Sequence, residues 1–195
     1  MSEETSTAAK ESKTAFVMEW VRDIAIAAAI AFLITLVIKP TVVKESSMEP
    51  NFYENDYLFL NKLAYKFGGQ PKKGDVIVFR SNEVDPNSGK RKLFIKRVIG
   101  VPGDRIDIIH NHLYINNKRD DESYTLDQMT GLDDEDMRDI RVQEGTYFCL
   151  GDNRNGSKDS RDPTVGPVDK DVIVGKAFFR LLPFNRAGPI KSVYK

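Results

Sequence analysis

The stretch KLFIKRVIGV, Lys92 to Val101, decides the fold class of this chain. It is short and rich in Val, Ile, Leu and Phe, which is typical of a β-strand. Side chains alternate between the two faces of a strand, so Phe94, Lys96 and Val98 share one face and Arg97 points to the other. Lys96 is therefore expected to enter the core side in apolar company.

Several further stretches have the same composition and are bounded by Gly, Pro, Asn or Asp. They read DYLFLNKL, GDVIVFR, DRIDII, HLYINN, GTYFCLG and DVIVGKAFFRLL. The pairs His110-Asn111 and Asn116-Asn117 are typical of hairpin turns. These patterns predict a mainly β protein, with an antiparallel β-sheet domain and few helices outside the N-terminal region.

Composition narrows the class of partner. The chain has 195 residues and a formal net charge of zero, which gives no support to a surface that binds nucleic acid. Its single cysteine, Cys149, excludes an intramolecular disulfide. Cys149 lies in the apolar run TYFCL, so we expect a small buried hydrophobe rather than a reactive thiol.

The interval from Lys118 to Arg141 differs from the strands around it. It is acidic, with the run Asp133 to Asp136, and has little apolar periodicity. A solvated acidic insertion is expected here. The sharper alternative is a calcium site, but the acids lack the spacing and the glycine of an EF-hand loop, so we predict no metal site.

An uncharged apolar run, Ile24 to Ile38, reads IAIAAAIAFLITLVI near the N-terminus. A cleaved signal peptide would need small residues after the run, and KPTVVKES has no A-x-A-like pair. A buried core helix fits poorly at one end of a strand-rich chain. We therefore predict a short tail over 1–13, a transmembrane anchor over 14–39 and an extracytoplasmic β domain over 40–195, with 118–141 as its acidic insertion.

Two features bound and orient this anchor. Ser12 or Thr14 is expected to cap the start of the helix, and a proline after Lys39 to end it. Positive charge is slightly more abundant before the apolar run than after it, which favours a cytoplasmic N-terminus. The charges compared are Lys10, Lys13 and Arg22 against Lys39 and Lys44.

The stretch ESSMEP, a few residues beyond the anchor, places Ser46 and Ser47 side by side. A serine nucleophile needs a partner that accepts its proton. The two histidines, His110 and His112, lie at a predicted turn and are expected to be surface residues. A lysine can serve if burial lowers its pKa, and Lys96 is the candidate on its predicted strand face.

Two other stretches carry hydroxyl groups. Ser192 and Lys195 form an S-x-x-K pattern at the end of the chain, where no core can desolvate the lysine, so we treat it as chance. GDNRNGSKDSRD, Gly151 to Asp162, is a long polar loop after an apolar strand. Its hydroxyls and ion pairs are candidates for orienting a nearby catalytic group.

In this order, behind a single N-terminal anchor, ESSMEP, FIKRVIGVPGD and GDNRNGSKDSR closely resemble the type I signal peptidases, in their short bacterial form. The resemblance runs from the anchor through VGKAFFRLLP and leaves out the first dozen residues and the acidic insertion. It implies an antiparallel β catalytic domain on the trans side of the membrane. It also implies endoproteolytic removal of signal peptides from secretory preproteins, typically after A-x-A, with no cofactor and with membrane lipid as a neighbour.

The resemblance assigns roles residue by residue. Ser47, directly before the methionine, matches the nucleophile, and Lys96 matches the general base. Ser157 matches a serine expected to hydrogen-bond the lysine, and Asp159 and Arg161 match the acid and arginine that support its loop.

The residues after the nucleophile complete the expected site. Met48 and Pro50 are expected to contact substrate. Asn51 stands where threonine is common in the family.

One departure affects the oxyanion. Glu45 stands where the family has glycine or serine, and a carboxylate repels an oxyanion rather than donating to it. This leaves open a catalytically silent, membrane-anchored β module. A self-cleaving Ser-Lys repressor is the other rival, but those proteins are soluble and carry a DNA-binding domain, whereas this chain has an anchor and no basic helical reader.

Overall fold

The chain divides at Ile38 into two units, which are described separately. The structure is a computed structural model. It describes residues 3–86, 88–130 and 136–194.

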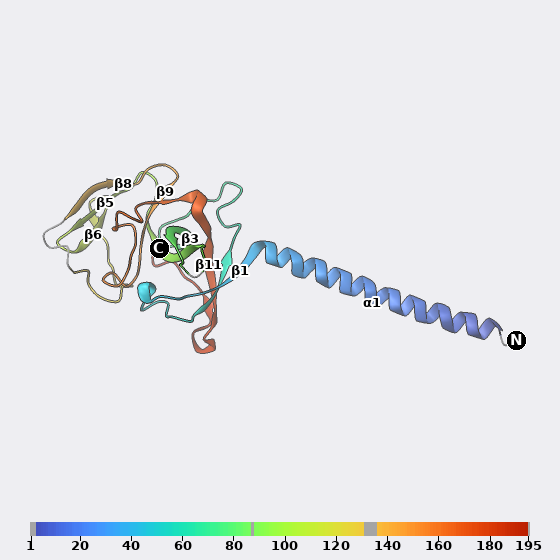
Figure 1. Ribbon diagram of the computed structural model, residues 1–195. Helices are drawn as coiled ribbons and strands as arrows, with labels where there is room; N and C mark the ends of the chain where they lie inside the picture. The colour runs from blue at the N-terminus through green and yellow to red at the C-terminus, as the bar shows by residue number, and fades with distance from the viewer. Residues whose placement is uncertain (1–2, 87, 131–135, 195) are drawn as a thin grey trace. The chain divides into compact units, whose positions relative to one another are not determined.

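The N-terminal unit is one continuous helix, α1 (Glu3–Val37), shown in Figure 1. It contains a 20-residue segment, Met18–Val37, that is apolar and long enough to cross a membrane. The helix begins well before Ser12 and Thr14, so the prediction that one of them caps its start is wrong. Residues 3 to 13, which we expected to form a tail, are helical. The helix ends two residues before Lys39, close to the predicted end.

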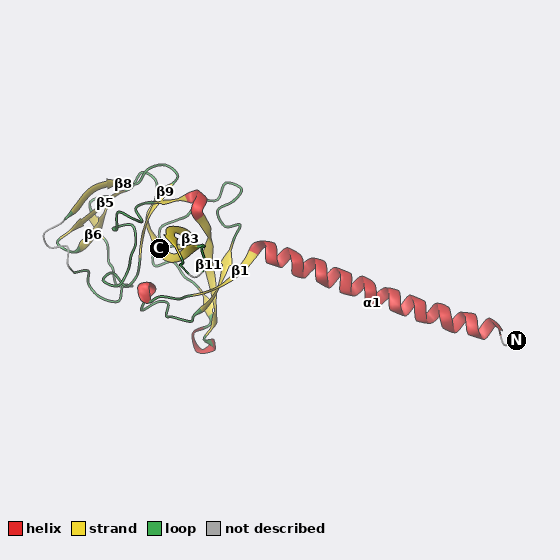
Figure 2. Cartoon of the chain, viewed as in Figure 1, coloured by secondary structure: helices red, strands yellow, loops and turns green. Residues whose placement is uncertain are grey.

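The unit after Ile38 is built from antiparallel strands, as the sequence predicted (Figure 2). Its larger sheet has the order β1 (Ile38–Val42), β2 (Tyr57–Asn61), β11 (Ile173–Leu182), β3 (Val76–Val84), β4 (Arg91–Gly100), β9 (Thr146–Leu150) and β10 (Val168–Asp169), with β12 (Gly188–Pro189) paired to β11. Short 3₁₀ helices interrupt the loops: η1 (Ser46–Met48), η2 (Lys170–Val172) and η3 (Phe184–Arg186).

A smaller sheet lies apart from β3 and β11 in Figure 1. Its order is β7 (Lys118–Arg119), β6 (His112–Ile115), β5 (Arg105–Ile109) and β8 (Met137–Arg141). Both predicted hairpin turns are confirmed, because His110, Asn111, Asn116 and Asn117 all have positive φ between these strands. Two such residues in a row are the signature of the type I′ turn.

The acidic insertion is more ordered than we expected. Its ends are the strands β7 and β8, and Met129 within it is buried in the core cluster of the smaller sheet. Tyr124 packs against the same cluster. The reading of 118–141 as a solvated insertion is therefore wrong for these parts, while residues 133–135 of the acidic run lie outside the described residues. In the described part of the chain, no group of three His, Cys, Asp or Glu side chains could hold a metal ion.

Two apolar clusters in the larger sheet flank the middle of β4. One includes Met48, Val76, Val78 and Ala177, and the other includes Phe94, Val98 and Cys149. Cys149 is fully buried, as predicted, and burial raises the pKa of its thiol. β4 therefore delivers its polar side chains into a water-poor interior.

Candidate active site

Ser47 lies on η1, and the buried residues Val43 and Met48 on either side of it in the sequence hold this helix in place. Val43 exchanges backbone hydrogen bonds with Asn55 and Asp56, and the Met48 side chain is fully buried in the core. The Ser47 side of the helix is pinned as well, since the Asn153 N–H donates to the Ser47 carbonyl at 3.1 Å. The nucleophile candidate is 3% exposed and fixed in position.

Lys96 comes from β4, paired through the backbone with Ile77 of β3. It is 1% exposed, and its Nζ lies 2.7 Å from Ser47 Oγ and 5.2 Å from the centre of the Phe94 ring. Phe94 lies two residues away on the same strand face, as the alternation predicted. The structure thus joins two residues that are 49 positions apart in the sequence.

Burial lowers the pKa of Lys96 below its ordinary value, because the apolar surroundings disfavour the ammonium. The negative charges of Asp159 and Glu45 partly oppose this effect. A neutral amine within hydrogen-bond distance of a buried hydroxyl can accept its proton, which is the arrangement that a serine nucleophile requires.

Arg97 points to the opposite face of β4, as predicted, but it is buried there. Its guanidinium donates to both carboxylate oxygens of Asp152, at 2.8 and 2.6 Å, and to the Gly74 carbonyl at 3.1 Å. Asn51 donates to the same carboxylate at 2.9 Å. Asp152 thus ties the strand that carries the lysine to the turn that carries the serine.

Sequence reasoning missed this role of Asp152. Arg97 was the sequence feature that could have predicted this role. It lies in an apolar strand next to a core-facing lysine, and an arginine that is buried there needs a buried acid as its partner. Asp152 follows a strand directly, in the stretch GDNR.

The loop that follows β9 carries the three predicted supporting residues. Asp159 accepts a hydrogen bond from the Gly151 N–H at 2.9 Å and two from the Arg161 guanidinium, both at 2.8 Å. Arg161 also donates to the carbonyls of Arg154 and Ser157. These contacts fix the loop behind Ser47.

Ser157 lies beside Gly151, on the side of that glycine that also faces the Ser47 carbonyl. Among the described residues, its buried Oγ has no hydrogen-bond partner. The hydrogen bond to Lys96 that the resemblance implied is therefore not formed in this structure.

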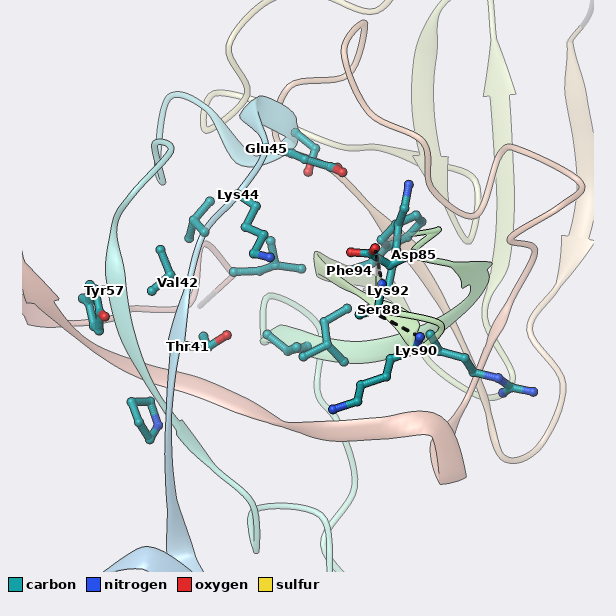
Figure 3. A pocket seen from close by; sticks show the side chains of 17 residues that line it. Thr41, Val42, Lys44, Glu45, Tyr57, Asp85, Ser88, Lys90, Lys92 and Phe94 are labelled. Carbon is teal, nitrogen blue, oxygen red and sulfur yellow. Dashed lines mark hydrogen bonds between the residues drawn. The ribbon is translucent and has the colours of Figure 1, made fainter.

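A groove of about 550 Å³ has Ser47 among its lining residues. Figure 3 shows side chains that line it, among them Lys44, Glu45 and Phe94. One wall is the segment from Pro40 to Glu45, and the other is the first half of β4 with the preceding turn. β9 pairs only with β4 residues from Arg97 onward, so the earlier part of β4 presents a free edge here.

Met48 and Pro50 do not line this groove. Met48 is fully buried in the core cluster that also contains Val43 and Phe52, and Pro50 is half-buried in the turn after η1. The groove therefore gives no support to the prediction that these two residues contact substrate. Met48 instead anchors the nucleophile turn.

Glu45 lines the groove and is exposed, and its side chain forms no capping hydrogen bond with η1. The backbone N–H of Ser47, in the first turn of η1, has no acceptor within that helix and is available to an oxyanion. His110 and His112 lie in and beside the β5–β6 turn, as predicted, away from this site. Lys195 of the S-x-x-K pattern lies outside the described residues.

Comparison with known proteins agrees with this geometry. Residues 17–182 match the family model described as signal peptidase, peptidase S26. The chain is 36% identical over 184 residues to signal peptidase IB of Staphylococcus aureus (strain COL), covering 87% of this chain and 91% of that one. It is 33% identical over 184 residues to signal peptidase I P of Bacillus subtilis subsp. natto, covering 91% and 95%.

A solved structure with sequence similarity is signal peptidase I from Enterococcus faecalis V583. It is 31% identical, with a TM-score of 0.42, and covers 55% of this chain and 96% of that one. The family match spans most of the chain, including the Ser47 turn, β4 and the loop after β9. The chain therefore belongs to the type I signal peptidases, serine peptidases of family S26.

Proposed function

We propose that this chain is a membrane-anchored endopeptidase that removes signal peptides from secretory preproteins with a Ser47–Lys96 dyad, cutting after small residues at A-x-A-type sites. The observation that carries the proposal is the buried contact of 2.7 Å between Lys96 Nζ and Ser47 Oγ. Family membership supports the substrate class.

Acylation begins with Ser47. Its oxygen bonds to the carbonyl carbon of the scissile peptide while its proton passes to the neutral amine of Lys96. The carbonyl π electrons move to the oxygen, and the Ser47 N–H donates to the resulting oxyanion. When the tetrahedral species collapses, the C–N bond breaks and the leaving amine takes the proton from Lys96.

Deacylation repeats these steps with water. Lys96, neutral again, accepts a proton from the attacking water, and the ester bond to Ser47 breaks with return of that proton to Ser47 Oγ. The role of Asp159 and Arg161 is to hold Gly151 and the Ser157 turn against the back of the nucleophile. Ser157 supplies a buried hydroxyl beside Gly151 that has no hydrogen-bond partner among the described residues.

The groove accounts for the form of the substrate. A peptide in an extended conformation can pair with the free edge of β4 and lie against the segment from Pro40 to Glu45. Its residue at the cleaved bond must approach a serine that is 3% exposed, which favours small side chains there.

The anchor accounts for where cleavage occurs. Ser47 follows Val37, the end of the candidate span, by ten residues, so it lies at most about 35 Å from that point. A signal peptide still held in the bilayer presents its cleavage site within that distance. We place the N-terminus in the cytoplasm and the unit after Ile38 on the other side, in keeping with the slight excess of cations before the span.

The test compares Ser46→Ala, Ser47→Ala and Lys96→Met with the unaltered protein on a preprotein with an A-x-A site, in neutral detergent. Ser46→Ala is the matched control, because Ser46 is the adjacent, exposed serine. We expect Ser47→Ala and Lys96→Met to lose cleavage and Ser46→Ala to keep it. Full cleavage by Ser47→Ala would overturn the dyad, and no cleavage by the unaltered protein would favour the silent module.

A further inference from the structure

Two lysines on facing walls of the groove form no ion pair with any residue that the structure describes. Lys44 lies on the segment after β1 and Lys90 lies just before β4, and Figure 3 shows them on opposite sides of the same space. Both are exposed, and none of the ion pairs formed between described residues includes either one. Lys92, by contrast, is neutralised by Glu83 at 3.0 Å.

The charge of the groove as a whole is positive. Besides the neutralised Lys92, three cations line it, Lys44, Lys90 and Arg91, against two carboxylates, Glu45 and Asp85. Asp85 is engaged in the β3–β4 turn, where it accepts a hydrogen bond from the Ser88 N–H at 3.1 Å. Glu45 adjoins Lys44 in the sequence and the Asp85 N–H donates to the Lys90 carbonyl at 2.8 Å, so the excess of positive charge belongs to the groove as a whole.

The positions of the two lysines along the groove follow from the chain. Lys90 precedes Lys96 by six residues and Lys44 precedes Ser47 by three. At no more than about 3.3 Å per residue, Lys90 lies at most roughly 20 Å from Lys96, and Lys44 at most roughly 10 Å from Ser47. A peptide strand of the same rise would bring its third to sixth residues from the cleaved bond along this stretch, and the third residue from the bond is already fixed by the A-x-A site.

The far end of the groove receives the upstream part of the substrate. Pro40 and Thr41 line that end, and they follow Val37, the end of the candidate span, by only three and four residues. A preprotein whose apolar segment is still in the bilayer must enter from this side. Residues upstream of the cleaved bond therefore pass between Lys44 and Lys90.

We propose, on the basis of the function proposed above, that Lys44 and Lys90 together bind an acidic side chain located four to six residues before the cleaved bond. This pair selects among preproteins that all carry an acceptable A-x-A site. Its attraction acts through exposed cations, so it is weakened by salt.

The experiment uses the full chain in neutral detergent and a set of matched preproteins. They share one A-x-A site and differ only in a single Asp, Asn or Lys, placed in turn at the fourth, fifth and sixth positions before the cleaved bond. The enzymes are the unaltered protein, Lys44→Gln, Lys90→Gln and the double variant. Lys191→Gln is the matched control, because Lys191 is exposed and lies outside the groove.

We expect the unaltered protein and Lys191→Gln to prefer the Asp substrate over the Asn substrate by roughly fivefold in kcat/KM, mainly through KM. The Lys substrate should rank last. The Asp-to-Asn ratio should fall in each single variant, approach one in the double variant, and shrink in high salt.

Equal kcat/KM for the Asp, Asn and Lys substrates would overturn the inference while leaving the proposed function intact. A charge preference that survives in the double variant would do the same. Failure to cleave even the Asn substrate would instead refute the proposed function. If the variants respond differently from the parent only to phosphatidylglycerol vesicles, the lysines bind lipid headgroups and the inference is wrong.

Discussion

Replacing Gly151 by alanine should disable the enzyme by displacing its nucleophile. An ideal Cβ at this position would lie 2.4 Å from the Ser47 carbonyl oxygen, about 1 Å short of ordinary contact at 3.4 Å. Gly151 cannot retreat, because its N–H is bonded to Asp159 and its carbonyl accepts a hydrogen bond from Arg154 at 3.1 Å. The Ser157 side chain, whose Oγ and Cβ would lie 2.2 and 2.4 Å from the new Cβ, and the Ser47 backbone must therefore both move.

The size of the effect follows from that displacement. A shift of about 1 Å would stretch the contact of 2.7 Å between Ser47 Oγ and Lys96 Nζ beyond hydrogen-bond range. Misplacement on this scale costs about 100-fold in rate, or about 2.7 kcal/mol in the barrier. We expect Gly151→Ala to lose that factor in kcat, measured on a preprotein in detergent.

Gly145→Ala is the matched control, because Gly145 precedes β9 as Gly151 follows it. Gly145 has a φ of 76° and open space around its Cβ position, so alanine meets torsional strain but no clash. We expect it to lose about 1–2 kcal/mol of stability, a few degrees in Tm, and to keep its activity. Activity of Gly151→Ala within twofold of the parent would refute the steric reasoning.

Three further predictions concern β4. Cleavage should fall toward acid pH as Lys96 becomes protonated, and Glu45→Gln should move this limb of the kcat/KM profile to lower pH, because the carboxylate raises the Lys96 pKa. A limb that stays in place or moves upward would contradict this. Lys96→Met should be inactive, yet it should need more urea than the parent to unfold at pH 7. The pKa of Lys96 is lower in the folded parent than in the unfolded chain, so proton binding at pH 7 favours the unfolded parent, and methionine removes this penalty. The parent should gain stability as pH rises toward ~10.4, the pKa of lysine in the unfolded chain. The difference in unfolding free energy between Lys96→Met and the parent should therefore be smaller at pH 10 than at pH 7, and an equal difference would argue against a neutral lysine. Arg97→Met should lower the unfolding free energy by about 3–5 kcal/mol, since it leaves Asp152 charged and unpaired in the interior. Lys158→Gln, which removes an exposed ion pair with Glu83, should change it by less than ~1 kcal/mol, and similar losses from both would contradict the prediction.

The strands and hairpins were predictable because their causes are local. Alternating apolar residues and Asn-rich turns specify β4 to β6 wherever the rest of the chain lies, and the positive φ values at Asn116 and Asn117 are a property of those two residues. β1 was not predictable in this way. Its first residue, Ile38, ends the apolar run and the other four, KPTV, follow it, so only pairing with β2 makes these five residues a strand.

The structure of the acidic insertion, 118–141, could not be predicted from its own sequence. Its composition predicts solvation, yet Tyr124 forms a hydrogen bond with Tyr194, 70 positions later, and Glu122 forms an ion pair with buried Arg154. Nothing within 118–141 indicates these partners. Charge patterns describe what a segment prefers in water, while the contacts that fix it come from distant parts of the chain.

For the candidate base Lys96, one property was predictable from the local sequence and another depends on distant parts of the chain. Alternation along β4 indicates that Lys96 faces the core, but the same pattern cannot say how dry that core is. Its pKa is lowered by burial against β3 and the Ser47 turn held by Met48, and the loop after β9 partly offsets this lowering through the charge of Asp159. Each contributor comes from a different segment, so the basicity of Lys96 exists only in the assembled sheet. A variant that loosens β3 or the Ser47 turn, without touching Lys96 or Asp159, should therefore raise the Lys96 pKa and shift activity toward alkaline pH, because water reaching the amine favours the ammonium.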